Sequence, residues 1–317
     1  MTEPKVLWAE RYKYLKAIQG LPLQDKIERT NSFIDKILEI SKRPVLAWSG
    51  GKDSTVALYL LLKKKPNIDV VWINTGVEFP ECIRFVQKIK REWSLNLHIA
   101  KPSLTFWTIS EKYGWPMMGK GGSGYWWSRA QYLKQQGKTK LAKATQAARI
   151  SAACCRILKE KPMKDACLVL GADLVIVGNL VSESRQRFLT WAQKGDFYFA
   201  KSEKRWKAWI LAPWTDSDIR NFNRIYNVPS SSIYEMGHLR NGCWPCLMDI
   251  KFKDNKLSIL RRSHPDLWRF LILKKGLGKR LLALKLALSD DEVNDFQNRS
   301  SVVEQLIEDK PCFFDTI

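Results

Sequence analysis

Short apolar runs alternate with longer amphipathic stretches through the middle of the chain. In the longer stretches, apolar residues recur every three or four positions, which is typical of helices that pack on one side. The short runs are expected to be strands and cover Val45–Trp48, Val70–Ile73, Leu97–Ala100 and Leu174–Val177. The helices expected between them cover Thr55–Lys64, Glu81–Trp93 and Cys155–Leu170. This alternation predicts an α/β fold with a doubly wound, mainly parallel sheet.

Helical patterns also flank this central region. Residues 8–40 predict two helices separated at Gly20-Leu21-Pro22. The alternation stops between residues 106 and 153, where a Gly- and aromatic-rich stretch precedes a basic helical pattern. We therefore expect N-terminal helices over 1–43, a central domain over 44–250 with a basic insertion at 106–153, and a helical, basic C-terminal region over 251–317.

The polar residues after the first predicted strand suit a phosphate group. Ser49-Gly50-Gly51-Lys52-Asp53-Ser54 joins this strand to a helix. Glycines permit the tight turn, and the free N–H groups of the loop and of the first helical turn attract an anion. Lys52 adds a positive charge, and the spacing excludes a Walker A loop. Asp53 is expected to cap the helix or to hold Mg²⁺ through water.

Two further strand ends carry polar side chains. Ligands of parallel sheets bind at the carboxyl ends of the strands, and Asn74–Glu78 falls at such an end, as Ser49–Ser54 does. After the fourth predicted strand, Arg185 and Arg187 are candidates for an anion clamp, and Glu183 for the residue that orients one of them.

The cysteines form the second strong pattern. Cys243-Trp244-Pro245-Cys246 places two thiolates on one turn, and Cys154-Cys155 supplies a second pair. Adjacent cysteines bind the several irons of a cluster more easily than one metal ion. The spacing alone leaves a [4Fe–4S] cluster, a structural zinc and unligated thiols as alternatives.

Composition and charge add a partner class. The seven cysteines indicate reduced thiols, and no apolar run reaches the length of a membrane span. The N-terminal residues do not resemble a signal peptide, so we expect a cytoplasmic protein. The formal net charge is +21, and residues 101–164 carry 13 Lys or Arg against 2 acids, while residues 251–285 carry 11 against 2. Such clustering favours a polyanionic partner, although a merely basic surface is the alternative.

The order of these motifs resembles the iron–sulfur type of the phosphoadenosine phosphosulfate reductase family, within the adenine nucleotide alpha hydrolase superfamily. The resemblance covers about residues 44–248. It comprises the Ser49–Ser54 loop and the elements Asn74-Thr75-Gly76-Val77-Glu78-Phe79-Pro80-Glu81, Cys154-Cys155-Arg156-Ile157-Leu158-Lys159-Glu160-Lys161-Pro162, Gly178–Arg185 and Gly242–Cys246. Asn74 replaces an aspartate of the family pattern, and Asn179-Leu180 stands where an arginine is usual.

The resemblance implies a fold and a set of ligands. It predicts an adenine nucleotide alpha hydrolase-like domain that binds ATP, adenylyl sulfate (APS) or phosphoadenylyl sulfate (PAPS). A [4Fe–4S] cluster on Cys154, Cys155, Cys243 and Cys246 is expected close to the nucleotide. The nucleotide-binding residues are expected to be Ser49, Gly50, Gly51, Lys52, Asp53, Ser54, Asn74, Thr75, Gly76, Glu183, Arg185 and Arg187.

One departure from the family pattern leaves the activity open. The reductases carry a C-terminal Glu-Cys-Gly-x-His, whose cysteine attacks the sulfonucleotide, and this sequence is absent here. The C-terminal cysteine of this chain is Cys312, which is either that nucleophile or an incidental buried residue.

We consider three hypotheses for the function. The first is ATP-dependent, adenylating sulfur transfer to a nucleic acid, DNA or tRNA, with catalytic roles for Lys52, Asp53 and Arg185. The second is an APS or PAPS reductase that releases sulfite, which needs Cys312 or another thiol. The third is a nucleotide- or redox-sensing nucleic-acid binder without catalysis. A sulfur donor or a thiol reductant protein would be a further partner, and a homodimer is left open.

Overall fold

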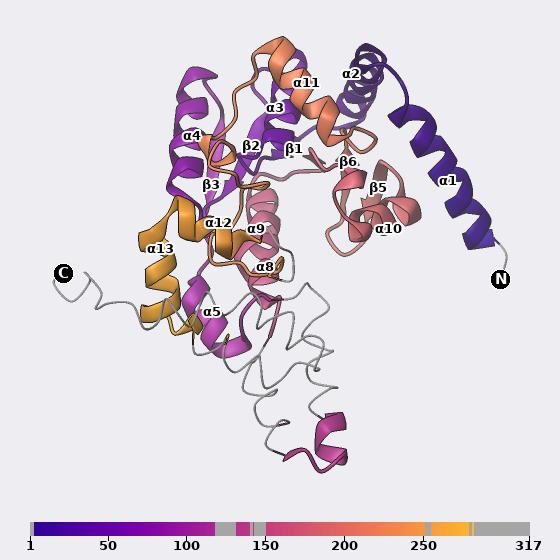
Figure 1. Cartoon of the computed structure of the whole chain (residues 1–317). Coiled ribbons are helices and arrows are strands. Elements are labelled where there is room, and N and C mark those ends of the chain that lie inside the picture. The colour runs from indigo at the N-terminus through magenta and orange to yellow at the C-terminus, as the bar shows by residue number, and fades with distance from the viewer. Residues whose placement is uncertain are drawn as a thin grey trace.

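Six strands in the described part of the chain form one sheet in the order β3-β2-β1-β4-β6-β5 (Figure 1). The computed structural model describes residues 3–117, 131–139, 142, 150–250, 255–278 and 281. The strands are β1 (Pro44–Ala47), β2 (Asp69–Ile73), β3 (Leu97–Ala100), β4 (Leu174–Val177), β5 (Phe197–Ala200) and β6 (Arg205–Trp209). All neighbouring pairs are parallel except β5 and β6. The four predicted strands are confirmed, whereas β5 and β6 were not predicted; charged residues interrupt the apolar positions of β6.

Helices cover both faces of this sheet, as predicted. Alternate residues of a strand point to opposite faces, so Leu46 and Val45 of β1 belong to different clusters. Leu46 packs in the main core with α2 (Leu23–Ile40), α3 (Lys52–Lys64), α4 (Pro80–Glu92) and α11 (Asp216–Tyr226). Val45 packs on the other face with Cys167 of α9 (Lys161–Val169). The sheet is therefore doubly wound.

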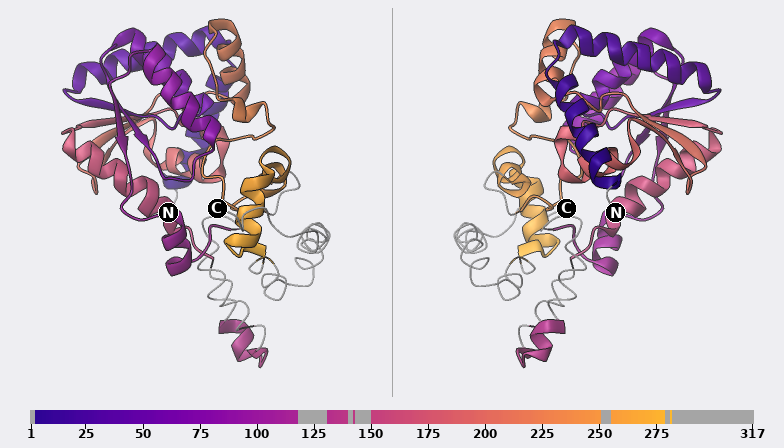
Figure 2. Two further views of the ribbon diagram at one scale, coloured as in Figure 1. Left: turned by 90° about the vertical axis from the view of Figure 1, so that its left-hand side faces the viewer. Right: turned by 90° about the vertical axis from the view of Figure 1, so that its right-hand side faces the viewer.

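A second apolar cluster lies beside the sheet and joins distant parts of the chain. It contains residues of α5 (Phe106–Tyr113), α8 (Ala153–Cys155), α12 (Lys256–Ser263) and α13 (Pro265–Arg269). Figure 1 shows α5 near α13 and away from the N-terminal helix α1 (Glu3–Gln19), and both views of Figure 2 show α5 and the C-terminal helices below the sheet. This cluster places the start of the insertion and the C-terminal helices around both cysteine pairs. The remaining elements are η2 (Val181–Glu183), α10 (Arg185–Lys194), η3 (Ser232–Tyr234) and η4 (Phe270–Lys274).

The predicted helix Cys155–Leu170 is continuous but contains a π-helical turn. Its segments are α8, η1 (Arg156–Glu160) and α9. Pro162 has no N–H to donate, and Lys161 N–H donates to the carbonyl of Arg156, five residues back. A π turn of this kind shifts the register of the side chains that precede it, which include Cys154 and Cys155.

The N-terminal helices α1 and α2 are separated at Leu21-Pro22, as the sequence predicts. A search of the described residues found no helix with the length and apolar character that crossing a bilayer requires. Most of the predicted basic helix of the insertion, and the tail with Cys312, lie outside the described residues.

Candidate nucleotide and cysteine site

The Ser49–Ser54 loop begins at the carboxyl end of β1 and is braced by its own hydroxyl groups. Ser49 Oγ lies 2.9 Å from Ser54 Oγ and accepts a hydrogen bond of 3.2 Å from Gly51 N–H. Ser54 Oγ donates to the carbonyl of Gly51 at 3.0 Å. Gly50 has a φ of +72°, and a Cβ at this position would lie 2.8 Å from Val86 Cγ2. The serines therefore shape the loop, and glycine is needed where the loop meets α4.

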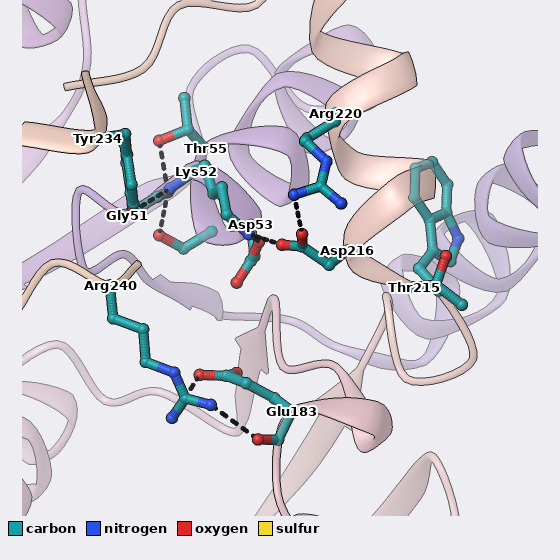
Figure 3. A network of polar contacts seen from close by, with 12 residues as sticks. Gly51, Lys52, Asp53, Thr55, Glu183, Thr215, Asp216, Arg220, Tyr234 and Arg240 are labelled. Carbon is teal, nitrogen blue, oxygen red and sulfur yellow. Dashed lines mark hydrogen bonds and ion pairs between the residues drawn. The ribbon is translucent and has the colours of Figure 1, made fainter. Parts of the chain in front are cut away.

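Lys52 is the first residue of α3 and lies between two carboxylates (Figure 3). Its Nζ pairs with Asp53 at 2.8 Å and also with Asp216, which contacts Arg220 at 2.6 Å. The N-cap of α3 is Gly51, and no side chain caps the helix. The expectation that Asp53 caps the helix is therefore wrong, because its carboxylate turns toward Lys52. Burial raises the pKa of Asp216, but the hydrogen bond from Lys52 and the charges of Lys52, Arg220 and Arg240 outweigh it and lower the pKa.

A segment distant in sequence, residues 234–241, contacts this loop, and no motif predicted this contact. Lys52 N–H donates to Tyr234 Oη at 3.0 Å, and Asn241 Nδ2 donates to the carbonyl of Ser49 at 2.9 Å. A Cβ on Gly51 would lie 2.7 Å from Asn241 Oδ1. Burial raises the pKa of Tyr234, which keeps its hydroxyl neutral. The backbone N–H of Lys52, at the start of α3, is therefore hydrogen-bonded to the neutral hydroxyl of Tyr234.

Glu183, which follows β4 in the sequence and ends η2, pairs with two arginines. Its carboxylate pairs with Arg187, as predicted, and with Arg240 at 3.3 Å, while its carbonyl accepts a 2.7 Å hydrogen bond from Arg240. Burial, followed by the charge of Arg240, lowers the pKa of Arg187 to about 10, and the nearby Asp53 opposes this shift. Arg185 is exposed at the start of α10, and no ion pair holds it within the described ranges. Its predicted role in the clamp stays a prediction.

The Asn74–Glu78 loop follows β2 and folds back on itself. Thr75 N–H and Oγ1 donate to the Glu78 carboxylate at 2.9 and 2.6 Å, and Gly76 N–H donates to Asn74 Oδ1 at 3.0 Å. An asparagine oxygen performs this turn-forming role as an aspartate would. The substitution of Asn for Asp in this motif therefore leaves the local structure intact.

Backbone contacts bring the two cysteine pairs to this loop. Glu78 and Cys243 form an antiparallel bridge, Trp244 N–H donates to the carbonyl of Val77 at 2.9 Å, and Thr75 Oγ1 lies 3.7 Å from Cys243 Sγ. In addition, Met117 bridges Leu247, which follows Cys246, and nearby Trp115 bridges Ile150, which precedes Cys154 in the sequence. Residues from four distant parts of the sequence thus surround the cysteines.

The electrostatics couple Cys154 to the other three cysteines of the two pairs. The pKa of Cys154 is raised by its hydrogen bond with Cys155, by burial, and by the charges of Cys246 and Cys243. The charge of Cys243 is also the main cause that raises the pKa of Lys159. Within the described part of the chain, no three His, Cys, Asp or Glu side chains are arranged to hold a metal ion.

Aromatic side chains enclose the cysteine region. Trp244 is 7% exposed, and its ring lies 5.7 Å from that of Trp107 and 6.3 Å from that of Phe270. Cys82 and Cys167 are 2% and 1% exposed and lie in the helices α4 and α9, so they belong to the core.

A buried polar chain fixes the segment that precedes Cys243. His264 Nε2 lies 3.0 Å from Glu81 Oε2, and its Nδ1 lies 2.8 Å from Ser263 Oγ. His238 Nε2 lies 3.0 Å from the same hydroxyl, and its ring packs 4.5 Å from that of Phe79. Burial and the nearby charges of His264 and Lys256 lower the pKa of His238 to about 4. These contacts give His238 a structural role in the segment before Cys243.

The sheet order and the loop after β1 define a doubly wound α/β domain with a candidate anion site at the carboxyl end of its first strand. Residues 43–248 match the model of the phosphoadenosine phosphosulfate reductase domain, which is more than half of the chain. The chain therefore belongs to the phosphoadenosine phosphosulfate reductase family.

Two relatives with a named activity are reductases. The chain is 28% identical over 210 residues to adenosine 5'-phosphosulfate reductase of Oceanobacillus iheyensis, covering 65% of this chain and 72% of that protein. It is 26% identical over 202 residues to phosphoadenosine 5'-phosphosulfate reductase of Alkalilimnicola ehrlichii, covering 63% and 68%. It is 27% identical over 228 residues to the uncharacterized protein MJ0973 of Methanocaldococcus jannaschii, covering 70% of this chain but 47% of that protein. The chain thus spans about half the length of this last relative.

A solved structure with a similar arrangement is the phosphoadenylyl-sulfate reductase of Candida auris in its phosphate complex. The TM-score is 0.45 at 17% identity, with 73% of this chain and 92% of that chain covered.

Proposed function

We propose that the protein is an enzyme that binds a sulfonucleotide, APS or PAPS, and reduces its sulfate group to sulfite. The observation that carries this proposal is that the candidate nucleotide site contacts the segment that carries Cys243. The Asn74–Glu78 loop contacts Cys243 and Trp244, while Asn241, two residues before Cys243, holds the Ser49 carbonyl. An anion on the phosphate loop would therefore lie close to the cysteines. The names of the relatives also favour reduction over adenylating sulfur transfer.

The nucleotide would be held mainly through its charged groups. The N–H groups at the start of α3, the ammonium of Lys52 and the guanidinium of Arg187 are the donors available to a phosphosulfate. Asp216 and Tyr234 occupy the donors of Lys52 in this structure, so an incoming anion must compete with them. Magnesium, which the sequence suggested at Asp53, is not required by this arrangement because Lys52 already balances that carboxylate.

The reaction would proceed by attack of a thiolate on the sulfate sulfur. A new S–S bond forms, the S–O bond to the phosphate breaks, and AMP or adenosine 3',5'-bisphosphate leaves with the bonding electrons. An external thiol then attacks the S-sulfocysteine and releases sulfite, and a second thiol resolves the resulting disulfide, so that two thiols supply the two electrons. We propose Cys312 as the first nucleophile; it lies outside the described residues.

A [4Fe–4S] cluster fits the cysteine set. Cys154, Cys155, Cys243 and Cys246 would hold it, and the observation in favour is that the bridges of Met117 with Leu247 and of Trp115 with Ile150 connect the two cysteine segments. When bound, such a cluster would supply a polarising charge beside the sulfonucleotide. Protein purified without oxygen should contain about four iron and four sulfide per chain, and Cys243→Ser should lose both. One zinc per chain without sulfide would contradict the cluster.

Sulfite release tests the reductase activity directly. The anaerobic protein is supplied with APS, PAPS or ATP and a thiol reductant, and sulfite and pyrophosphate are measured. Cys312→Ser should abolish sulfite release, whereas Cys167→Ala, a control in the core, should retain it. Absence of sulfite with both sulfonucleotides would overturn the proposal.

Adenylating sulfur transfer to DNA or tRNA remains a second candidate. The absence of a Glu-Cys-Gly-x-His sequence and the net charge of +21 favour it. Pyrophosphate released from ATP only when a nucleic acid is present, with binding that weakens steeply as salt rises, would support this candidate. Binding of nucleotide and nucleic acid with no turnover would instead indicate a sensor.

A further inference from the structure

Arg240 lies at the nucleotide site although no motif indicated it. Figure 3 shows its side chain with Glu183 on one side of the site, facing the group formed by Lys52, Asp53 and Asp216. Its guanidinium makes two contacts with Glu183, at 2.7 Å to the carbonyl and 3.3 Å to the carboxylate. The side chain is nevertheless 58% exposed, so that part of the guanidinium is accessible to a ligand.

The backbone around Arg240 is fixed on both sides. His238 is 3% exposed and packs on Phe79, and Asn241 donates its 2.9 Å hydrogen bond to the Ser49 carbonyl. Trp244 then pairs with Val77. The position of Arg240 beside the phosphate loop is therefore set by buried contacts and not by its own exposed side chain.

The charges around the site leave a positive surplus. Lys52, Arg187, Arg220 and Arg240 are connected through ion pairs to only three carboxylates within the described residues, those of Asp53, Glu183 and Asp216. Glu183 cannot neutralise both of its arginines. The field of Arg240 reaches Asp216 and Arg187, whose pKa values it lowers. An anion placed among these side chains would balance the charge.

We propose that Arg240 is the second arginine of the anion clamp, paired with Arg187, and that it binds the phosphate or phosphosulfate group of the adenine nucleotide; this inference rests on the proposed nucleotide site. Arg185, which the sequence suggested for this role, is two residues before Arg187 on the chain but exposed and outside the ion-pair network of the described residues. The clamp thus combines one arginine after β4 with one from the segment that carries Cys243.

Calorimetric titration of the full chain without oxygen tests this inference. The probes are AMP and pyrophosphate, which are charged and unreactive here, and neutral adenosine. Arg240→Ala should weaken AMP and pyrophosphate binding at least about tenfold, since hydrogen bonds to charged groups are strong, while adenosine binding stays within about twofold. Arg240→Lys should recover only part of the loss, because an ammonium lacks the planar fork. Arg91→Ala, an exposed arginine in the last turn of α4, serves as the control and should change nothing.

Several results would overturn the inference. Equal losses for adenosine and AMP would show that Arg240 only supports the fold of the site. No loss in Arg240→Ala, with a loss in Arg185→Ala, would assign the clamp to Arg185. Failure of the wild-type chain to bind any of the anions would overturn both the clamp and the nucleotide site. If the clamp behaves as expected but no sulfite is released, the reductase proposal fails and the role of Arg240 stands.

Discussion

Gly50→Ala should destabilise the protein through two separable effects. The φ of +72° at Gly50 lies in the left-handed region, which costs an L-residue about 1–2 kcal/mol. The added Cβ would also lie 2.8 Å from Val86 Cγ2. Val86 is 1% exposed in the main core, so its side chain has little room to move, and overpacking of this kind costs about 1–3 kcal/mol. The combined loss in the free energy of unfolding is expected to be about 2–5 kcal/mol.

Gly76→Ala provides the matched control. Gly76 has a φ of +79°, but a Cβ there would meet nothing within 4 Å. It should therefore show the backbone cost alone, and both variants share the same gain from a less flexible unfolded chain. The difference between the two variants isolates the contact with Val86. Urea unfolding followed by tryptophan fluorescence gives both free energies.

A double-mutant cycle identifies the contact directly. Val86→Ala alone should destabilise the core, but in the Gly50→Ala background it should cost less, because it removes the clash. AMP binding should weaken in Gly50→Ala, since the loop must move away from α4. Equal stability of Gly50→Ala and Gly76→Ala, with no coupling to Val86, would refute the conclusion that the loop is pressed against α4.

Three further predictions concern charged groups. Lys26→Ala should lower the free energy of unfolding by about 3–5 kcal/mol, because it removes the cation that lies 2.8 Å from the buried carboxylate of Asp218. A Lys26→Met/Asp218→Asn double variant should recover most of this loss. A loss below about 1 kcal/mol on the urea curves, the value of a surface ion pair, would contradict the reasoning. Asp216→Asn should tighten pyrophosphate binding by up to about fivefold, because it frees Lys52 from a partly exposed ion pair worth up to about 1 kcal/mol. Weaker binding in the titration would show that Asp216 contacts the ligand instead. The pKa of His238 is lowered from 6.5 to about 4, so this histidine takes up its proton more readily in the unfolded chain, and the free energy of unfolding should fall as pH drops from about 6.5 to 4. In His238→Gln, the free energy of unfolding should depend less on pH across this range. An unchanged pH dependence would exclude this histidine as the cause.

Much of the fold could be predicted because its signals are local. Each of β1 to β4 is an apolar run with its own boundaries, and a parallel sheet buried on both faces requires such runs. The strands β5 and β6 form an antiparallel hairpin at one edge of the sheet. In β6, charged residues alternate with apolar ones and Trp206 is 41% exposed, so no continuous apolar run marks this strand. β5 is itself a short aromatic run, so its omission has no comparable local cause.

The site was only partly predictable because its decisive contacts are long-range. The loop residues Ser49–Ser54 follow one strand, so their motif indicated an anion site without any knowledge of the fold. What the motif could not show is that Asp216 and Tyr234 reach Lys52 across 164 and 182 residues of sequence. For Arg240, the nearest signal was its position shortly before Cys243, in a segment already assigned to the cysteines. If the cysteines lie beside the nucleotide, the residues that lead into them must pass the phosphate loop as well. A motif at one site therefore predicts that its sequence neighbours contact the other, and this reasoning would have placed Arg240 at the nucleotide site from the sequence alone.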